Sequence, residues 1–192
     1  MVSPATLVPR PETEILVERA LMLIGRSATL RILDLGTGSG AIALAIARER
    51  PLCEVVATDL SADALAIARQ NARQLDIANI SFACGDWIDP VKGQQFDLIV
   101  SNPPYVSETD AALALHRHEP LSALSAGTDG LDAIRRIAAA AGGVLVDGGR
   151  LLLEHGSSQR EAVAAVLQTN DWSQVEFFND YAGLPRVTLA TR

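Results

Sequence analysis

The sequence predicts an α/β fold, with a seven-stranded, mostly parallel sheet and helices on both of its faces. Short apolar runs of strand length alternate with amphipathic stretches of helix length along the chain, which is typical of a parallel sheet. A glycine-rich turn joins the first apolar run to the helical stretch after it. The last two apolar runs have no helix between them, which predicts an antiparallel C-terminal hairpin at the sheet edge.

Length and composition fit one globular domain over residues 1–192. Hydrophobic residues make up 48% of the chain and charged residues 20%, so it can bury a core without disulfides or metal. Cys53 and Cys84 lie in apolar surroundings without metal-ligand spacing, and we expect buried, reduced thiols and no metal site. The chain opens with no secretory signal and has no bilayer-length apolar run, so we expect a cytoplasmic protein without membrane contact.

The first half of the chain alternates strand and helix. The first helical stretch begins with Pro11 and ends near Gly25, as helices often do. Ser61 precedes another amphipathic stretch and is suited to cap it. The expected helices span residues 11–24, 41–48 and 61–75, and the expected strands span residues 31–35, 54–57, 80–83 and 96–100.

The second half continues this alternation. Residues 129–146 predict a long helix that Gly148 and Gly149 end. Ser158 followed by Glu161 has the spacing of a capping box, which predicts a helix to about residue 168. Strands are expected over residues 151–154, 175–178 and 186–190.

One long irregular stretch, residues 106–126, follows a predicted strand. We expect a substrate loop or lid there, because functional loops gather at strand ends. His116 and His118 within it are expected to be solvated. His155 follows a predicted strand and is expected to be structural, while the sequence assigns no role to Glu119.

A glycine-rich segment, Asp34-Leu35-Gly36-Thr37-Gly38-Ser39-Gly40, follows the first predicted strand and opens a helix. Glycines let the backbone turn tightly and approach a ligand, and N–H groups at a helix start attract electron-rich groups. In an open α/β sheet, ligands bind in the crevice beyond the carboxyl ends of the strands. We therefore expect Gly36, Thr37, Gly38, Ser39 and Gly40 to bind a cofactor.

Two acidic residues narrow the class of cofactor. Asp59 ends the second predicted strand, where a carboxylate can accept hydrogen bonds from ribose hydroxyls, or can cap the turn into the next helix. Asp86 can accept from an adenine amino group and Trp87 can line the pocket of the ring, or both can belong to an ordinary turn. The glycine pattern also matches the dinucleotide fingerprint, so NAD and S-adenosylmethionine both remain open.

The segment Ser101-Asn102-Pro103-Pro104-Tyr105 decides between these two cofactors. Consecutive prolines after a strand fix φ twice, so the carbonyls point in set directions. A planar NH2 group can donate two hydrogen bonds. The Asn102 Oδ1 can accept one of them and the Pro103 carbonyl can accept the other. Tyr105 can lie against the flat face of the amide or base. A rigid turn without chemistry is the alternative.

This arrangement suits methylation of a planar nitrogen. An amide nitrogen is a poor nucleophile, because its lone pair is delocalised. Two acceptors aimed at its hydrogens localise electron density on the nitrogen and orient it toward the methyl carbon of a sulfonium. No strong base is required, since the methylated nitrogen is very acidic. The segment therefore predicts an S-adenosylmethionine-dependent N-methyltransferase with Asn102, Pro103 and Tyr105 as catalytic residues.

Six segments of the chain are considered together: residues 9–14 (PRPETE), 34–40 (DLGTGSG), 102–105 (NPPY), 119–120 with 126–127, 152–156 (LLEHG) and 180–187. Together they resemble the peptide chain release factor glutamine N5-methyltransferases, a family with the Rossmann-like class I methyltransferase fold. The likeness runs over essentially the whole chain. The Asn-Pro-Pro-Tyr motif is shared with DNA and rRNA amino-methyltransferases, whereas the first and the fifth of the segments are more specific to this family.

The resemblance implies that S-adenosylmethionine is the cofactor and S-adenosylhomocysteine the product. It implies that the substrate is the glutamine of the Gly-Gly-Gln motif in class I release factors. The cofactor would be held by Gly36 to Gly40, Asp59, Trp87 and Asn102, and the glutamine by Asn102, Pro103, Pro104 and Tyr105. Arg10, Glu12 and Thr13 would lie near the mouth of the site, or serve only to start a helix. Family members usually carry a helical N-terminal docking domain, whereas this chain begins close to the catalytic domain.

Three other functions are weighed against this one. The first is a nucleic-acid amino-methyltransferase acting on adenine N6 or guanine N2. The formal net charge of −7 counts against it, because proteins that grip phosphates carry a basic surface. The second is an NAD-dependent oxidoreductase, which has no use for Asn-Pro-Pro-Tyr. The third is a module that binds the cofactor without catalysis. We expect a monomer.

Overall fold

The computed structural model describes residues 1–111, 113 and 119–192. Helices and strands alternate, with short 3-10 turns at Asp89–Val91, Leu121–Ala123 and Gly142–Val144. The helices are α1 (Thr13–Leu23), α2 (Ala41–Glu49), α3 (Ala62–Gln74), α4 (Asp132–Ala141) and α5 (Arg160–Thr169). The strands are β1 (Arg31–Leu35), β2 (Glu54–Asp59), β3 (Ile80–Cys84), β4 (Phe96–Ser101), β5 (Leu145–Glu154), β6 (Ser173–Asn179) and β7 (Pro185–Thr191).

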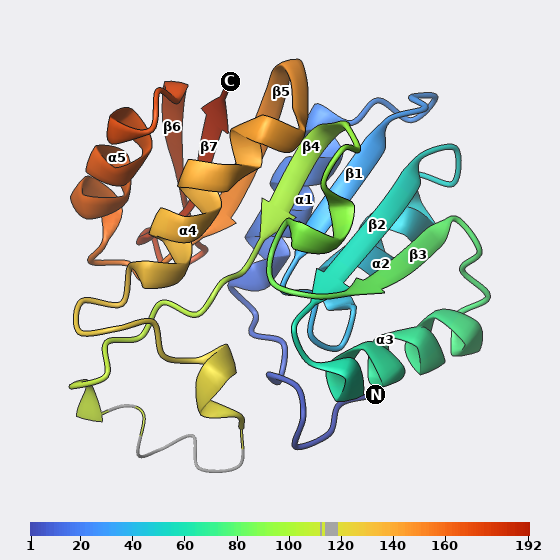
Figure 1. Cartoon of the computed structure of the whole chain (residues 1–192), viewed down its shortest axis with the longest axis horizontal. Coiled ribbons are helices and arrows are strands. Elements are labelled where there is room, and N and C mark those ends of the chain that lie inside the picture. The colour runs from blue at the N-terminus through green and yellow to red at the C-terminus, as the bar shows by residue number, and fades with distance from the viewer. Residues whose placement is uncertain (112, 114–118) are drawn as a thin grey trace.

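One sheet contains these strands in the order β3-β2-β1-β4-β5-β7-β6 (Figure 1). β1 pairs in parallel with β2 and β4, while β7 runs antiparallel to both β5 and β6. The predicted mostly parallel sheet with an edge hairpin is therefore confirmed. The chain leaves β1 toward one edge and returns at β4 toward the other, so the strand order reverses between these two. Such a reversal opens a crevice at the carboxyl ends of the strands.

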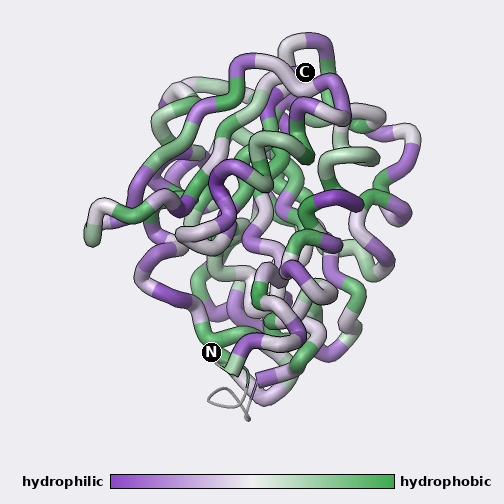
Figure 2. Tube along the Cα trace, turned by 90° about the vertical axis from the view of Figure 1, so that its left-hand side faces the viewer, coloured by the Kyte–Doolittle hydropathy of each residue, from purple (hydrophilic) through white to green (hydrophobic). Residues whose placement is uncertain are grey.

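Both faces of the sheet are covered. Leu33 packs into a cluster with α4 and α5, whereas its neighbour Ile32 packs into a cluster with α1 and α2. Successive side chains of a strand point to opposite faces, which explains why β1 carries apolar side chains toward both faces. Hydrophobic stretches of the chain cross the middle of the molecule in Figure 2, and the two termini lie at opposite ends.

The predicted helix over residues 129–146 was wrong at its C-terminal end. α4 stops at Ala141, and Leu145 is already in β5, paired with Phe96. The 3-10 turn at Gly142–Val144 ends the helix, whereas Gly148, at φ +74°, lies inside β5 where the pairing register shifts. A glycine in a strand can mark a bulge as readily as a helix end, so β5 is longer than predicted.

Two smaller predictions also fail. No capping box forms at Ser158, because α5 begins at Arg160 and its N-cap residue, Gln159, makes no side-chain cap hydrogen bond. Cys84 is exposed, since it ends the edge strand β3, whereas Cys53 is buried as predicted. The cap on α3 is confirmed, because the Ser61 hydroxyl oxygen accepts from the Ala64 N–H at 3.1 Å.

The irregular stretch over residues 106–126 is closed at its base. Val106 forms an isolated bridge with Ser125, and its carbonyl accepts from the Ala126 N–H at 3.1 Å. His116 and His118 lie outside the described residues. In the part of the chain that the structure describes, no helix is both long and apolar enough to cross a membrane.

Candidate active site

A cavity of about 700 Å³ opens at the carboxyl ends of β1, β2 and β4. The N-terminal segment, the glycine loop and the base of the irregular stretch enclose it. Of the residues predicted to bind the cofactor, only Gly40 does not line it. The others, which do, are Gly36, Thr37, Gly38, Ser39, Asp59, Asp86, Trp87 and Asn102.

The glycine loop takes its shape from left-handed backbone. Gly36 and Gly38 have φ of +70° and +55°, which side-chain-bearing residues rarely adopt. A Cβ on Gly36 would meet the Trp87 ring at 3.4 Å, whereas one on Gly38 would have nothing within 4 Å. The positive φ is therefore what favours glycine at Gly36, which lies beside the indole ring, and Gly38 presents bare backbone to the cavity.

Gly40 has a packing role. It is the N-cap residue of α2 with φ +84°. A Cβ there would lie 3.0 Å from the Leu44 Cδ1 and 3.2 Å from the Ala68 Cβ. Absence of a side chain lets the start of α2 approach α3, so Gly40 shapes the loop without facing the cavity.

Asp59 joins the loop after β1 to the start of α3. Its Oδ2 accepts from the Gly38 N–H at 2.8 Å, and its Oδ1 accepts from the Ser61 N–H at 2.8 Å. The turn role and the cavity position thus coexist in one side chain. A carboxylate has about four acceptor sites, so these two bonds leave capacity for hydroxyl groups inside the cavity.

At another wall, Asp86 forms an ion pair with Arg136 of α4, and both side chains line the cavity. Trp87 has φ +45°, and its carbonyl accepts from the Thr58 hydroxyl at 3.2 Å. Sequence reasoning missed Arg136, because a lone arginine on an amphipathic helix carries no local signal that it faces a site.

Below the loop, Asp34 is fully buried and accepts from the Thr37 hydroxyl at 2.7 Å. Burial raises the pKa of Asp34 to about 7, which the Thr37 hydrogen bond only partly opposes. The carboxyl holds the loop from beneath and does not line the cavity.

Residues 102–105, the proline corner, follow β4 and separate the large cavity from a smaller one of about 210 Å³. Asn102 and Pro104 line both cavities, whereas Pro103 and Tyr105 line only the smaller one. The Asn102 Nδ2 donates to the Thr13 hydroxyl at 3.1 Å, so Oδ1 is the side-chain atom left to accept another hydrogen bond. A small planar group in the second cavity would therefore meet an acceptor at the boundary with the first.

An ion pair fastens the N-terminal segment beside the smaller cavity. Arg10 lines this cavity and pairs with Glu119, whose Oε2 also accepts from the Val8 N–H at 2.9 Å. Glu119, to which the sequence assigned no role, thus ties the segment before α1 to the end of the irregular stretch. Thr13, for its part, lines the large cavity.

Beneath the corner lie buried polar groups. The Tyr105 hydroxyl donates to the Glu154 Oε1 at 3.1 Å, and the Tyr105 carbonyl accepts from the Gln159 Nε2 at 3.0 Å. Burial raises the pKa of Tyr105, and the charge of Glu154 raises it further, so the phenol stays protonated. Burial also raises the pKa of Glu154, against hydrogen bonds from Thr13 and Tyr105.

His155 lines neither cavity. It is buried with its ring edge against Phe177, and burial lowers its pKa. Its Nδ1 lies 2.9 Å from the Gly156 carbonyl, so a neutral ring would donate there. These contacts fit the expected structural role.

Comparison with known proteins gives a consistent result. The chain matches the family described as "Methyltransferase domain" over residues 26–181. It is 52% identical over 189 residues to the release factor glutamine methyltransferase of Salmonella typhimurium, covering 97% of this chain and 68% of that protein. It is 47% identical over 191 residues to the enzyme of the same name from Coxiella burnetii, covering 100% of this chain and 69% of that protein.

Solved structures resemble the chain as well. The release factor-specific protein-(glutamine-N5) methyltransferase of Alicyclobacillus acidocaldarius is 32% identical with a TM-score of 0.61, covering 100% of this chain and 98% of that one. A 16S rRNA methyltransferase of T. thermophilus, solved with AdoMet and guanosine, is 20% identical with a TM-score of 0.71, covering 96% of this chain and 44% of that one. The second likeness concerns the fold alone.

Proposed function

The chain belongs to the family of release factor glutamine methyltransferases, and we propose that it methylates the side-chain amide nitrogen (N5) of the glutamine in the Gly-Gly-Gln motif of class I peptide chain release factors, with S-adenosylmethionine as the methyl donor. The observation that carries this proposal is the shared wall of the two cavities. Asn102 and Pro104 face both, so a donor in the large cavity and an amide in the small one would meet at the corner.

The residues of the large cavity fit S-adenosylmethionine. Asp59 offers free acceptor sites to ribose hydroxyls, and Asp86 with Trp87 offers a carboxylate and an aromatic edge to the adenine. The open side of Gly38 lets a ligand lie against the backbone. When bound, the cofactor supplies an electrophilic methyl carbon on a positively charged sulfur. Gly36, Thr37, Gly38, Ser39, Asp59, Asp86, Trp87 and Asn102 are the proposed cofactor-binding residues.

The corner would then bind and orient the substrate amide. Asn102 Oδ1 accepts one hydrogen of the NH2 group and the Pro103 carbonyl accepts the other, which localises the lone pair on nitrogen. The fixed φ of the prolines keeps the Pro103 carbonyl in place before the substrate arrives, and the hydrogen bond to Thr13 holds the Asn102 side chain. Both oxygens also face the positive charge that develops on nitrogen during the transfer. Asn102, Pro103 and Tyr105 are the proposed catalytic residues. Pro104 lines the smaller cavity, in which we place the substrate amide.

Mass spectrometry tests this function. A class I release factor is incubated with the protein and S-adenosylmethionine, and its Gly-Gly-Gln peptide is sequenced. We expect one added methyl on the glutamine, and none on a release factor in which that glutamine is replaced by glutamate. DNA and RNA are tested in parallel reactions. If one of them is methylated while the release factor stays unmethylated, the proposal is refuted and the nucleic-acid alternative is favoured. Thermal shift with NAD serves as a control for the cofactor.

Two further properties belong to the same proposal. We propose that residues 1–192 act as one catalytic domain, because β1 to β7 form one sheet, and that the domain is a monomer, which size-exclusion chromatography with light scattering tests. A substrate that takes part in translation supports a cytoplasmic location, which fractionation tests.

A further inference from the structure

Tyr105, the last residue of the proline corner, is held at both ends by one short segment. Its hydroxyl donates to Glu154, and its backbone carbonyl accepts from Gln159. The two partners stand 49 and 54 residues further along the chain. They flank the turn that connects β5 to α5. The corner is thus braced by a part of the fold that lines neither cavity.

Glu154 is fully buried. Its Oε1 accepts from the Tyr105 hydroxyl. The Thr13 hydroxyl lies near enough to lower the pKa of the carboxyl, but Oε2 makes no close hydrogen bond among the described residues. A buried carboxylate that lacks partners is costly to keep. An apolar side chain of similar size could fill the same space. A carboxylate at this position therefore indicates that a hydrogen-bond acceptor is needed beneath the corner.

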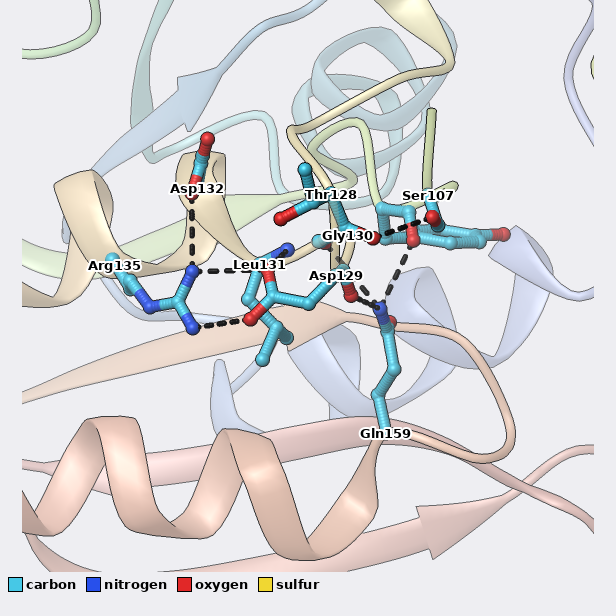
Figure 3. Close-up of polar contacts among 9 residues, drawn as sticks. Ser107, Thr128, Asp129, Gly130, Leu131, Asp132, Arg135 and Gln159 are labelled. Atoms are coloured by element: carbon cyan, nitrogen blue, oxygen red, sulfur yellow. Dashed lines mark hydrogen bonds and ion pairs between the residues drawn. The ribbon is translucent and has the colours of Figure 1, made fainter. Parts of the chain in front are cut away.

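Gln159 connects the corner to a neighbouring loop. Its Nε2 lies 3.0 Å from the Tyr105 carbonyl and 3.3 Å from each of the Asp129 and Gly130 carbonyls, while its Oε1 accepts from the Gly156 N–H at 2.8 Å. Figure 3 shows Gln159 reaching up to the loop that carries Asp129, Gly130 and Leu131. The amide therefore donates on one side and accepts on the other, and only a glutamine-like group satisfies both.

The approach of this loop to the corner is close. A Cβ on Gly130 would lie 2.3 Å from the Tyr105 carbonyl oxygen and 2.8 Å from the Gln159 Nε2. The loop is stiffened by Arg135, which contacts both Asp129 and Asp132 (Figure 3). Ser107, just after the corner, also donates to the Thr128 carbonyl at 2.6 Å. Several contacts therefore join the corner to the loop, with Gln159 at their junction.

We propose that Glu154 and Gln159 are positioning residues for methyl transfer, which hold Tyr105 from its hydroxyl and its carbonyl so that the proline corner keeps its acceptors aligned with the substrate amide. This inference rests on the proposed function. Neither side chain lines the cavities, so both act through residues that do, and Tyr105 is the residue that both of them contact. Since a displacement of about 1 Å can cost a hundredfold in rate, loosening the corner should lower kcat while leaving cofactor binding nearly intact.

The first test replaces Gln159 by glutamate. Glutamate keeps the shape of the side chain and the oxygen that accepts from the Gly156 N–H. It replaces the NH2 group that faces three carbonyls by a second oxygen, which cannot donate to them. We expect kcat for the release factor to fall about tenfold or more, with the Kd for S-adenosylmethionine changed less than about twofold. Gln168→Glu makes the same chemical change on the exposed side of α5 and should leave kcat unaltered. If Gln159→Glu matches wild type, the inference is wrong.

A double-mutant cycle separates positioning from general stability. Glu154→Met keeps the length of the side chain and removes the acceptor. If Glu154 acts through the Tyr105 hydroxyl, Glu154→Met should lower kcat in the wild-type background by a larger factor than in Tyr105→Phe. Equal factors in both backgrounds would overturn the role of Glu154. Circular dichroism and thermal unfolding are measured for each variant, so that loss of folded protein is not counted as loss of kcat.

A third measurement needs neither cofactor nor substrate. The chain has two tyrosines, so 19F NMR of 3-fluorotyrosine-labelled protein gives two signals, and Tyr181→Phe assigns them. We expect Glu154→Gln to shift the Tyr105 signal. An unchanged signal would overturn the inference even if the release factor is methylated. A different result is that the Tyr105 signal shifts in Glu154→Gln while the wild-type protein leaves release factors unmodified. That result would refute the proposed function together with the catalytic part of this inference.

Discussion

Asn102 and Thr13 stand 89 residues apart in the chain, yet the Asn102 amide donates to the Thr13 hydroxyl at 3.1 Å. This bond fixes which side of the Asn102 amide is available. With Nδ2 engaged by α1, Oδ1 remains as the acceptor, which is the polarity that a substrate NH2 group requires. The start of α1 thereby takes part in orienting the corner after β4.

Thr13→Val should lower kcat while Thr13→Ser should not. Valine keeps the shape but leaves Asn102 without its acceptor, so the amide is free to turn, and we expect a loss of about tenfold in kcat. The serine variant keeps the hydroxyl and serves as the matched control. Steady-state kinetics with a release factor substrate measures both, and equal kcat values for the two variants would contradict the role of Thr13.

Asn102→Ala should reduce turnover far more than cofactor affinity. Removal of one of two acceptors for the substrate amide is expected to cost about a hundredfold in kcat, whereas Kd for S-adenosylmethionine should change only a few-fold, because many other groups line the large cavity. Isothermal titration and single-turnover rates test the two quantities separately. A turnover rate near wild type would remove the acceptor role.

Asp59→Asn should weaken cofactor binding. The carboxylate accepts from both the Gly38 and Ser61 N–H groups, and an asparagine has only one oxygen to offer them. Hydrogen bonds to charged groups contribute about 1.5–3 kcal/mol, so we expect Kd for S-adenosylmethionine to rise at least about tenfold. Unchanged affinity in isothermal titration would reduce Asp59 to a turn residue.

Two glycines of the same loop should respond differently to alanine. Gly40→Ala forces a Cβ against Leu44 and Ala68, and we expect a loss of about 2 kcal/mol in unfolding free energy from strain and overpacking. Gly38 lines the cavity and has open space around it but also has φ +55°. Gly38→Ala should therefore cost only the backbone strain, about 1 kcal/mol, and should lower cofactor affinity more than Gly40→Ala does. Urea unfolding and isothermal titration on both variants test this contrast. Equal losses of unfolding free energy and equal changes in Kd for the two variants would contradict it.

Asp34 should make stability depend on pH. Burial raises its pKa from 3.8 to about 7 in the folded chain, so between these values the folded state binds more protons than the unfolded state. Stability from this group is therefore fully present below about pH 4 and is lost as the pH rises to about 7. Asp34→Asn cannot titrate, so the difference in unfolding free energy between wild type and this variant should shift in favour of the variant from pH 5 to pH 8. A constant difference would contradict the raised pKa.

The elements that the sequence predicts well are those set by local patterns. The apolar run of β1, the glycine turn after it and the Ser61 cap each depend on neighbours within a few residues, so their signals survive in the linear sequence. The end of α4 was misplaced because glycines occur both at Gly142–Gly143 and at Gly148–Gly149. Either pair could end a helix, and only the pairing of Leu145 with Phe96 places the break.

By itself, the sequence determined the fold class, the glycine loop and the proline corner, because periodicity, backbone freedom and fixed φ are properties of consecutive residues. Only the tertiary structure decided that Arg136 reaches the wall with Asp86, that Gly40 packs instead of facing the cavity, and that Glu154 and Gln159 hold Tyr105. These contacts depend on the order of strands in the sheet, which brings distant segments to one edge, and the spacing of residues along the chain does not record which side chains meet there.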